Sequence, residues 1–99
     1  MITITAEEYN KVKDDVRTVD VRTEQEYRIL VRFNWAENIP IDELLPNIDK
    51  YFPDKEERIV IVCNAGNRSS EVAGILNSNG YDNAAVLLGG IYGYKRKFL

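Results

Sequence analysis

The run Ile59-Val60-Ile61-Val62 constrains the fold more than any other segment of the chain. All four residues are apolar and β-branched, and such residues favour strands. The run has no polar alternation, which is typical of a strand covered on both faces in a parallel sheet. Parallel strands must be joined by crossover connections, and these are usually helices. We therefore predict an α/β fold in which residues 59–62 form a central strand.

Strand and helix signals alternate on both sides of this run. Capping boxes of the form Thr-x-x-Glu at residues 5–8 and 23–26 predict two helix starts. The other expected helices are a short turn capped by Asp42 and running through Leu45, a segment from Pro46 to Tyr51, and residues 68–78 and 91–97. The other expected strands are residues 2–4, 16–21, a short one ending at 38–40, and 84–88. This order predicts a central, mostly parallel sheet of about five strands with helices on both faces.

Length and charge limit the classes of function. A chain of 99 residues with 44 % hydrophobic residues has room for one core, so we expect a single domain over residues 1–99. The formal net charge of −3 provides no positive field for a nucleic-acid backbone or an anionic membrane. The apolar stretches are too short to cross a bilayer, and the first residues lack the pattern of a signal peptide. We expect a cytoplasmic protein with neither nucleic-acid nor membrane partners.

The chain has one cysteine, Cys63, and no histidine. One cysteine excludes an internal disulfide and a Cys-x-x-Cys redox pair, and the absence of histidine removes the usual base of cysteine and serine enzymes. We expect no metal and no cofactor. Any chemistry at Cys63 must proceed without imidazole.

The loop after the central strand is the candidate site. Cys63 ends the strand, and a helix is expected to begin near Arg68, so backbone amides and a positive helix end should surround the sulfur. Such surroundings lower a cysteine pKa from about 8.5 into a range of roughly 3.5–7.5, and the Arg68 guanidinium would add to the effect. Gly66 allows the tight turn, and Ser69 can cap the helix or bond the sulfur. The alternative is that Cys63 is a small core residue at a strand end.

The sequence of this loop, Cys-Asn-Ala-Gly-Asn-Arg-Ser, resembles the active loop of the rhodanese family, Cys-Arg-x-Gly-x-Arg followed by Ser. Asn64 takes the place of the family's first arginine. Further segments in the same order resemble the family's Asp-Val-Arg…Glu-Tyr, Asn-Ile-Pro…Glu-Leu and late Gly-Gly patterns. These segments are residues 19–22 with 26–27, residues 38–40 with 43–44, and residues 88–91. The family's Gly-His-Ile-x-Gly-Ala has no counterpart, because residues 31–36 read Val-Arg-Phe-Asn-Trp-Ala.

The resemblance implies a rhodanese-like fold and thiosulfate sulfurtransferase activity. Cys63 would be the catalytic nucleophile, which takes the sulfane sulfur of thiosulfate or of a persulfide donor and passes it to cyanide or a thiol. The acceptor, a thiol or protein, must come from outside the chain, since there is no second cysteine. The substrate-binding residues would be Asn64, Ala65, Gly66, Asn67, Arg68 and Ser69. Asp20 and Arg22 are expected either to support this loop or merely to pair locally.

Two other functions stay open. Cysteine phosphatases and arsenate reductases also place a thiolate in an amide cradle closed by arginine, but with the spacing CxxxxxR, whereas this chain has CxxxxR. The shorter loop favours a persulfide sulfur over a phosphoryl group. The other alternative is a catalytically idle binding module of the same fold.

Several residues outside the loop allow both a functional and a structural interpretation. Aromatic residues near the site could rim a pocket, but in so small a domain they more often form core. Cations near the C-terminus could steer an anion or complement the dipole of the last helix. Arg32 could gate an anion or be a solvated side chain. The aromatic residues are Trp35, Tyr92, Tyr94 and Phe98, and the cations are Lys95, Arg96 and Lys97.

Overall fold

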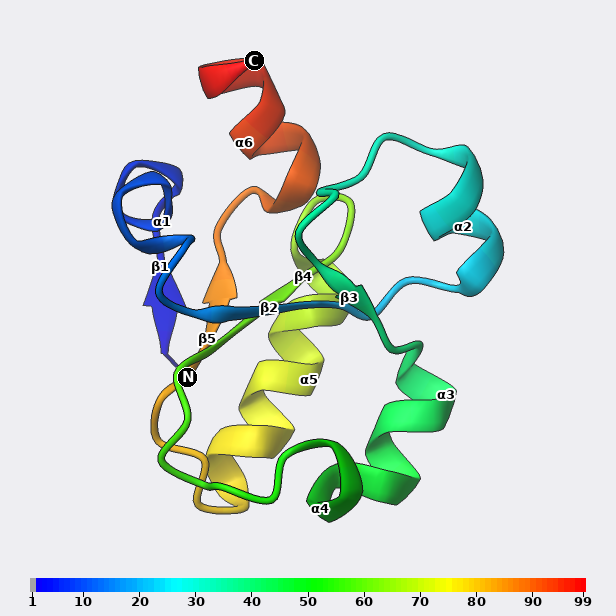
Figure 1. The fold of residues 1–99 in the computed structure, drawn as a ribbon, viewed down its shortest axis with the longest axis vertical. Coiled ribbons are helices and arrows are strands. Elements are labelled where there is room, and N and C mark those ends of the chain that lie inside the picture. The colour runs from blue at the N-terminus through cyan, green and yellow to red at the C-terminus, as the bar shows by residue number, and fades with distance from the viewer. Residues whose placement is uncertain (1) are drawn as a thin grey trace.

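A computed structural model describes residues 2–99 and contains one five-stranded sheet, in the order β1-β5-β4-β2-β3 (Figure 1). Every neighbouring pair of strands is parallel. The strands are β1 (Thr3–Ile4), β2 (Arg17–Asp20), β3 (Glu37–Asn38), β4 (Ile59–Val62) and β5 (Ala84–Leu87). The β-branched run therefore forms the central strand of the sheet, and the predicted α/β fold is confirmed, with a sheet that is wholly parallel.

Helices fill the connections between the strands, and α6 follows the last strand (Figure 1). They are α1 (Ala6–Val12), α2 (Glu24–Ile29), α3 (Ile41–Leu44), the 3₁₀ turn η1 (Leu45–Asn47), α4 (Ile48–Tyr51), α5 (Asn67–Ser78) and α6 (Gly90–Phe98). Both predicted capping boxes form at the starts of α1 and α2. Across residues 2–99, no helix combines the length and the apolar character that a membrane span requires.

The expectation that Asp42 caps a helix is wrong. Helix α3 begins at Ile41, and Pro40 occupies the cap position, two residues before Asp42, without a side-chain hydrogen bond. The backbone carbonyl of Pro40 accepts the N–H groups of Glu43 and Leu44, over 3.0 and 2.9 Å. Asp42 lies instead inside the first turn, where its negative charge complements the positive end of the helix dipole.

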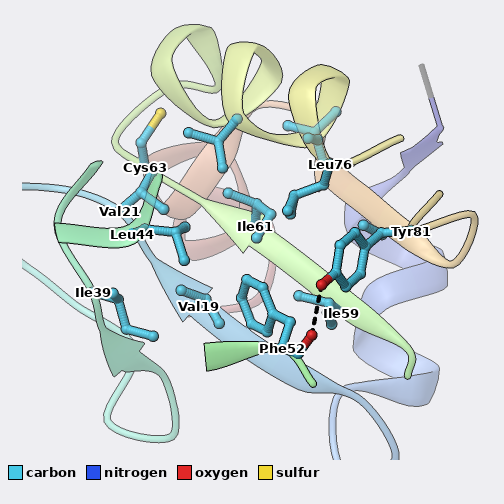
Figure 2. Close-up of a cluster of buried hydrophobic side chains, with 14 residues drawn as sticks. Val19, Val21, Ile39, Leu44, Phe52, Ile59, Ile61, Cys63, Leu76 and Tyr81 are labelled. Carbon is cyan, nitrogen blue, oxygen red and sulfur yellow. Dashed lines mark hydrogen bonds between the residues drawn. The ribbon is translucent and has the colours of Figure 1, made fainter. Parts of the chain in front are cut away.

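Side chains of β4 alternate between two buried clusters because successive residues of a strand point to opposite faces. Ile59, Ile61 and Cys63 belong to the cluster shown in Figure 2, which also contains Leu76 of α5 and Leu44 of α3. Val60 and Val62 face the other cluster, which holds residues of α1 and α6. Both faces of the sheet are thus covered by helices, as the absence of polar alternation predicted.

Cys63 lies at one end of the cluster in Figure 2, and Tyr81 lies toward the other. The buried Tyr81 hydroxyl donates to the backbone carbonyl of Phe52 over 2.6 Å, so a polar atom in this core has a partner. Satisfied polar groups of this kind avoid the free-energy cost of burying an unpaired donor. Among residues 2–99, no buried side-chain nitrogen or oxygen lacks a hydrogen-bond partner, so this core contains no unpaired polar side chain.

On the opposite face, Tyr9, Phe33 and Tyr94 pack together as core, and Trp35 stacks against them from the surface, where it is 43 % exposed. Tyr94 is buried and meets Tyr9 edge-on at 5.7 Å between ring centroids. Trp35 stacks on Phe33 at 4.7 Å, and its indole N–H donates to the Tyr9 hydroxyl over 2.8 Å. Aromatic packing therefore accounts for the positions of Trp35 and Tyr94, which could also have formed the rim of a pocket.

Candidate active site

The sulfur of Cys63 lies at the carboxyl end of β4, inside the loop that leads into α5. The backbone N–H of Gly66 donates to it over 3.2 Å, and the backbone N–H of Ser69 over 3.5 Å. The Ser69 hydroxyl lies 3.2 Å from the same sulfur, so this side chain contacts the cysteine and does not cap α5. The loop thus places several hydrogen-bond donors around one sulfur atom.

These contacts shift the pKa of the cysteine. Burial raises the pKa of the Cys63 thiol, because it disfavours the charged form. Hydrogen bonds from the Ser69 hydroxyl and from the backbone N–H groups of Ser69, Gly66 and Arg68 outweigh burial, so the pKa lies below its ordinary value. These donors therefore favour the thiolate form of Cys63, and they do so without an imidazole base.

Gly66 makes the turn of the loop possible. Its φ of 113° lies in the left-handed region, which L residues with a side chain rarely adopt. This conformation turns the Gly66 N–H toward the sulfur while α5 begins at the next residue. A side chain at this position would strain the backbone that forms the amide cradle.

The guanidinium of Arg68 forms a bidentate ion pair with Glu26 of α2. Its Nη1 and Nη2 donate to the two carboxylate oxygens over 2.6 and 2.9 Å. The hydrogen bond with Arg68 lowers the pKa of Glu26 to about 2, so the carboxylate is charged at neutral pH. The pair with Glu26 also raises the pKa of Arg68, and the charge of Cys63 contributes to that rise. The charge of Arg68 therefore interacts with that of a Cys63 thiolate through space, while its hydrogen bonds go to Glu26.

Asp20 and Arg22 form a buried ion pair beneath the loop, and both side chains are fully excluded from solvent. Nε and Nη2 of Arg22 hold the Asp20 carboxylate over 2.8 to 3.1 Å. Nη1 continues to the side-chain oxygen of Asn64 over 2.9 Å and to the backbone carbonyl of Val31 over 3.1 Å. The pair thus does more than stabilise its own strand end, because it fixes a residue of the cysteine loop.

Two further residues that sequence reasoning did not assign to the site also hold it in place. The side-chain amide of Asn38, at the end of β3, donates to the backbone carbonyls of Asp20 and Arg22. Glu26 entered only as part of a capping box and of the family's Glu-Tyr pattern. Neither pattern contains the information that the same carboxylate binds Arg68.

The start of α6 supports the loop from a third direction. The N–H groups of Ile91 and Tyr92 donate to the backbone carbonyls of Cys63 and Asn64, over 2.9 and 3.0 Å. At Gly90, with φ of 62°, a Cβ atom would lie 2.5 Å from the Asn64 carbonyl oxygen. Gly90 is the second glycine of the late Gly-Gly pattern, and the structure shows that it allows this close approach.

The remaining substrate-binding candidates of the loop lie at its surface. Ala65 and Asn67 are exposed at the surface of the loop. A cavity of about 190 Å³ opens beside Arg68, and it is lined by Val21, Thr23, Pro40, Ile41, Asp42 and Arg68.

Two of the cations that could have steered or gated an anion have other partners. Arg32 packs over the Tyr27 ring, and Lys97 pairs with Glu7. Within residues 2–99, no three histidine, cysteine or acidic side chains are grouped so as to hold a metal ion.

The chain belongs to the family of rhodanese-like domains, because the family model matches residues 5–97. The rhodanese domain-containing protein CG4456 of Drosophila melanogaster is 35 % identical over 82 % of this chain and 87 % of its own length. Thiosulfate sulfurtransferase PspE of Escherichia coli is 35 % identical over 64 % of this chain and 60 % of its own. Sulfurtransferase-type chemistry is the activity class that this family supports.

Solved structures show the same fold. A rhodanese-like domain protein from Staphylococcus aureus is 34 % identical, with a TM-score of 0.78, and the match covers 95 % of this chain and 91 % of that one. The chain also matches the tRNA uridine(34) hydroxylase of Erwinia tasmaniensis, at 34 % identity over 93 % of its residues. It spans only 28 % of that relative, so the match describes one domain of a larger protein.

Proposed function

We propose that the protein is a sulfurtransferase that moves a sulfane sulfur from thiosulfate or a persulfide donor to cyanide or a thiol, through a persulfide on Cys63. The observation that carries this proposal is the Cys63 sulfur, which is held by the Gly66 and Ser69 amides and by the Ser69 hydroxyl. These donors favour an anionic sulfur. A thiolate and a persulfide anion are both such species.

In the first half-reaction the Cys63 thiolate attacks the outer sulfur of thiosulfate. A sulfur–sulfur bond forms to Cys63, the sulfur–sulfur bond of thiosulfate breaks, and its electron pair leaves with sulfite. Sulfite is a stable anion, so the leaving group needs no general acid. This agrees with a chain that contains no histidine.

In the second half-reaction cyanide or a thiolate attacks the outer sulfur of the persulfide. The bond between the two sulfurs breaks, and the Cys63 thiolate is restored as the leaving group. The amide cradle assists because it stabilises this thiolate as the charge returns to it. The acceptor thiol comes from another molecule, since the chain has one cysteine.

Intact mass spectrometry after incubation with thiosulfate tests the proposal. We expect the protein to gain the mass of one sulfur atom, to lose it on addition of cyanide, and to show no gain in the Cys63→Ser variant. Circular dichroism of that variant provides the folding control. Thiocyanate released in the cyanide step measures turnover. A folded protein that gains no sulfur from thiosulfate or from a persulfide would contradict the proposal and favour an idle binding module; phosphatase turnover without sulfur transfer would favour the phosphatase.

A further inference from the structure

The cations at the cysteine loop are neutralised by carboxylates. Arg22 is paired with Asp20 and Arg68 with Glu26, so each guanidinium that contacts the loop has an acidic partner. Between them lies the neutral amide of Asn64, whose oxygen accepts from Arg22 and whose nitrogen lies 3.4 Å from Glu26. These five side chains add up to no net charge around a thiolate.

Glu26 is held firmly in this arrangement. Besides binding Arg68, its Oε1 accepts the backbone N–H of Thr23 over 3.2 Å and closes the capping box of α2. Its geometry is therefore set by the helix start as well as by the ion pair. Asp42, a further exposed carboxylate, lines the same cavity as Arg68.

This balance of charges affects which sulfur donors can approach the thiolate. A sulfane donor must bring its outer sulfur to a thiolate, and Coulomb repulsion between the two grows with the charge of the donor. An unpaired arginine would offset that repulsion and would do so more strongly for a dianion than for a monoanion. Here the negative charge of Glu26 cancels most of the attraction that Arg68 would exert on an anionic donor, and Asn64 contributes no charge.

Building on the proposed function, we propose that Glu26 sets the charge selectivity of the sulfur donor. Through its pair with Arg68, and with Asn64 as a neutral neighbour, it makes the site favour sulfane donors with one negative charge or none over the thiosulfate dianion. Glu26 acts through Arg68 and is a positioning residue. It takes no part in bond formation.

Thiosulfate and methanethiosulfonate form a matched pair of probes, because they differ by one charge and have similar shapes. In both, the Cys63 thiolate bonds to the outer sulfur and the sulfur–sulfur bond of the donor breaks. The electron pair leaves with sulfite in one case and with methanesulfinate in the other. Each reaction leaves the same Cys63 persulfide, so intact mass measures both on one scale.

The experiment compares second-order rates of persulfide formation for the two donors in the parent, Glu26→Gln and Glu24→Gln. Glutamine still completes a capping box, so α2 is retained in Glu26→Gln. Glu24 lies in the same helix and pairs with Arg28 at the surface, so its variant makes the same change in net charge away from the loop. The ratio of the two rates is the readout, since a loss of folded protein lowers both rates equally.

We expect the parent to react faster with methanethiosulfonate. In Glu26→Gln the ratio of the two rates should shift toward thiosulfate by about tenfold. A change of this size corresponds to the interaction of two unit charges at an effective dielectric constant between that of water and that of a protein surface. Glu24→Gln should keep the parent ratio. Salt should reduce the shift in Glu26→Gln, because it screens charges at the surface. Asn64→Arg, which adds a cation at the loop, should shift the ratio in the same direction.

Three results would overturn the inference. A parent that prefers thiosulfate would contradict it directly. An equal ratio in Glu26→Gln and Glu24→Gln would show that the ion pair does not select the donor, while persulfide formation itself would leave the proposed function standing. If neither donor forms the persulfide on folded parent protein, the inference fails, and the proposed function fails with it when a persulfide donor adds no sulfur either.

Discussion

The buried guanidinium of Arg22 donates a hydrogen bond of 2.9 Å to the side-chain oxygen of Asn64. The two residues are 42 positions apart in the sequence, but they follow β2 and β4, which are neighbours in the sheet. The bond therefore ties the end of one strand to the cysteine loop that follows the other. The loop is fixed by the sheet as well as by its own turn.

Replacing Arg22 by Met should cost about 3–5 kcal/mol of unfolding free energy, because it leaves Asp20 as an unpaired buried charge. Urea denaturation measures this loss. The double variant Asp20→Asn/Arg22→Met should recover part of it, since no buried charge then lacks a partner. A single variant as stable as the parent would contradict the supporting role of the pair.

Replacing Ser69 by Ala should raise the pKa of Cys63, because the Ser69 hydroxyl is the largest of the contributions that lower it. Below the pKa of the variant the thiolate fraction falls, so alkylation by iodoacetamide should become slower there and reach the parent rate at high pH. The pH dependence of the alkylation rate measures the shift. Ser78→Ala, at the far end of α5, is the matched control and should leave the profile unchanged. An unshifted profile in Ser69→Ala would show that the amides alone set the pKa.

Replacing Gly90 by Ala should destabilise the protein by about 3 kcal/mol or more, since it combines a strained positive φ with a Cβ in contact with the cysteine loop. The added atom would lie 2.5 to 2.7 Å from the backbone of Cys63 and Asn64. Gly74→Ala is the control in α5, where a Cβ meets nothing within 4 Å. It should stabilise the helix by about 0.5–1 kcal/mol. Thermal unfolding of both variants tests the contrast, and similar effects of the two substitutions would refute it.

The Glu26–Arg68 pair should appear in the acid stability of the protein. The folded-state pKa of Glu26 is about 2, below its ordinary value of 4.5, so folding is favoured by its ionised form. This contribution is fully present above a pH of about 4.5 and is lost as the pH falls toward about 2. The unfolding free energy of Glu26→Gln should therefore fall less steeply over that range than in the parent. Glu24→Gln should follow the parent, and a Glu26→Gln curve parallel to the parent would contradict the assignment.

Much of the fold follows from the sequence because the signals are local and periodic. The β-branched run at 59–62 predicts a strand covered on both faces, and the capping boxes at Thr5 and Thr23 predict the starts of α1 and α2. The error at Asp42 has a local cause as well. Pro40 and Asp42 are both compatible with a helix start, and the backbone carbonyl of Pro40, which accepts two N–H groups, places that start two residues earlier.

By itself, the sequence determined the alternation of strands and helices, the position of Cys63 at the end of the central strand, and a turn that only Gly66 makes easily. Tertiary structure alone decided which partners meet at that cysteine. Glu26 binds Arg68, and Arg22 reaches Asn64, in both cases across 42 positions of sequence. The physical reason is that periodicity and capping act over a few residues, whereas the partner of a charged side chain depends on which strands become neighbours in the sheet.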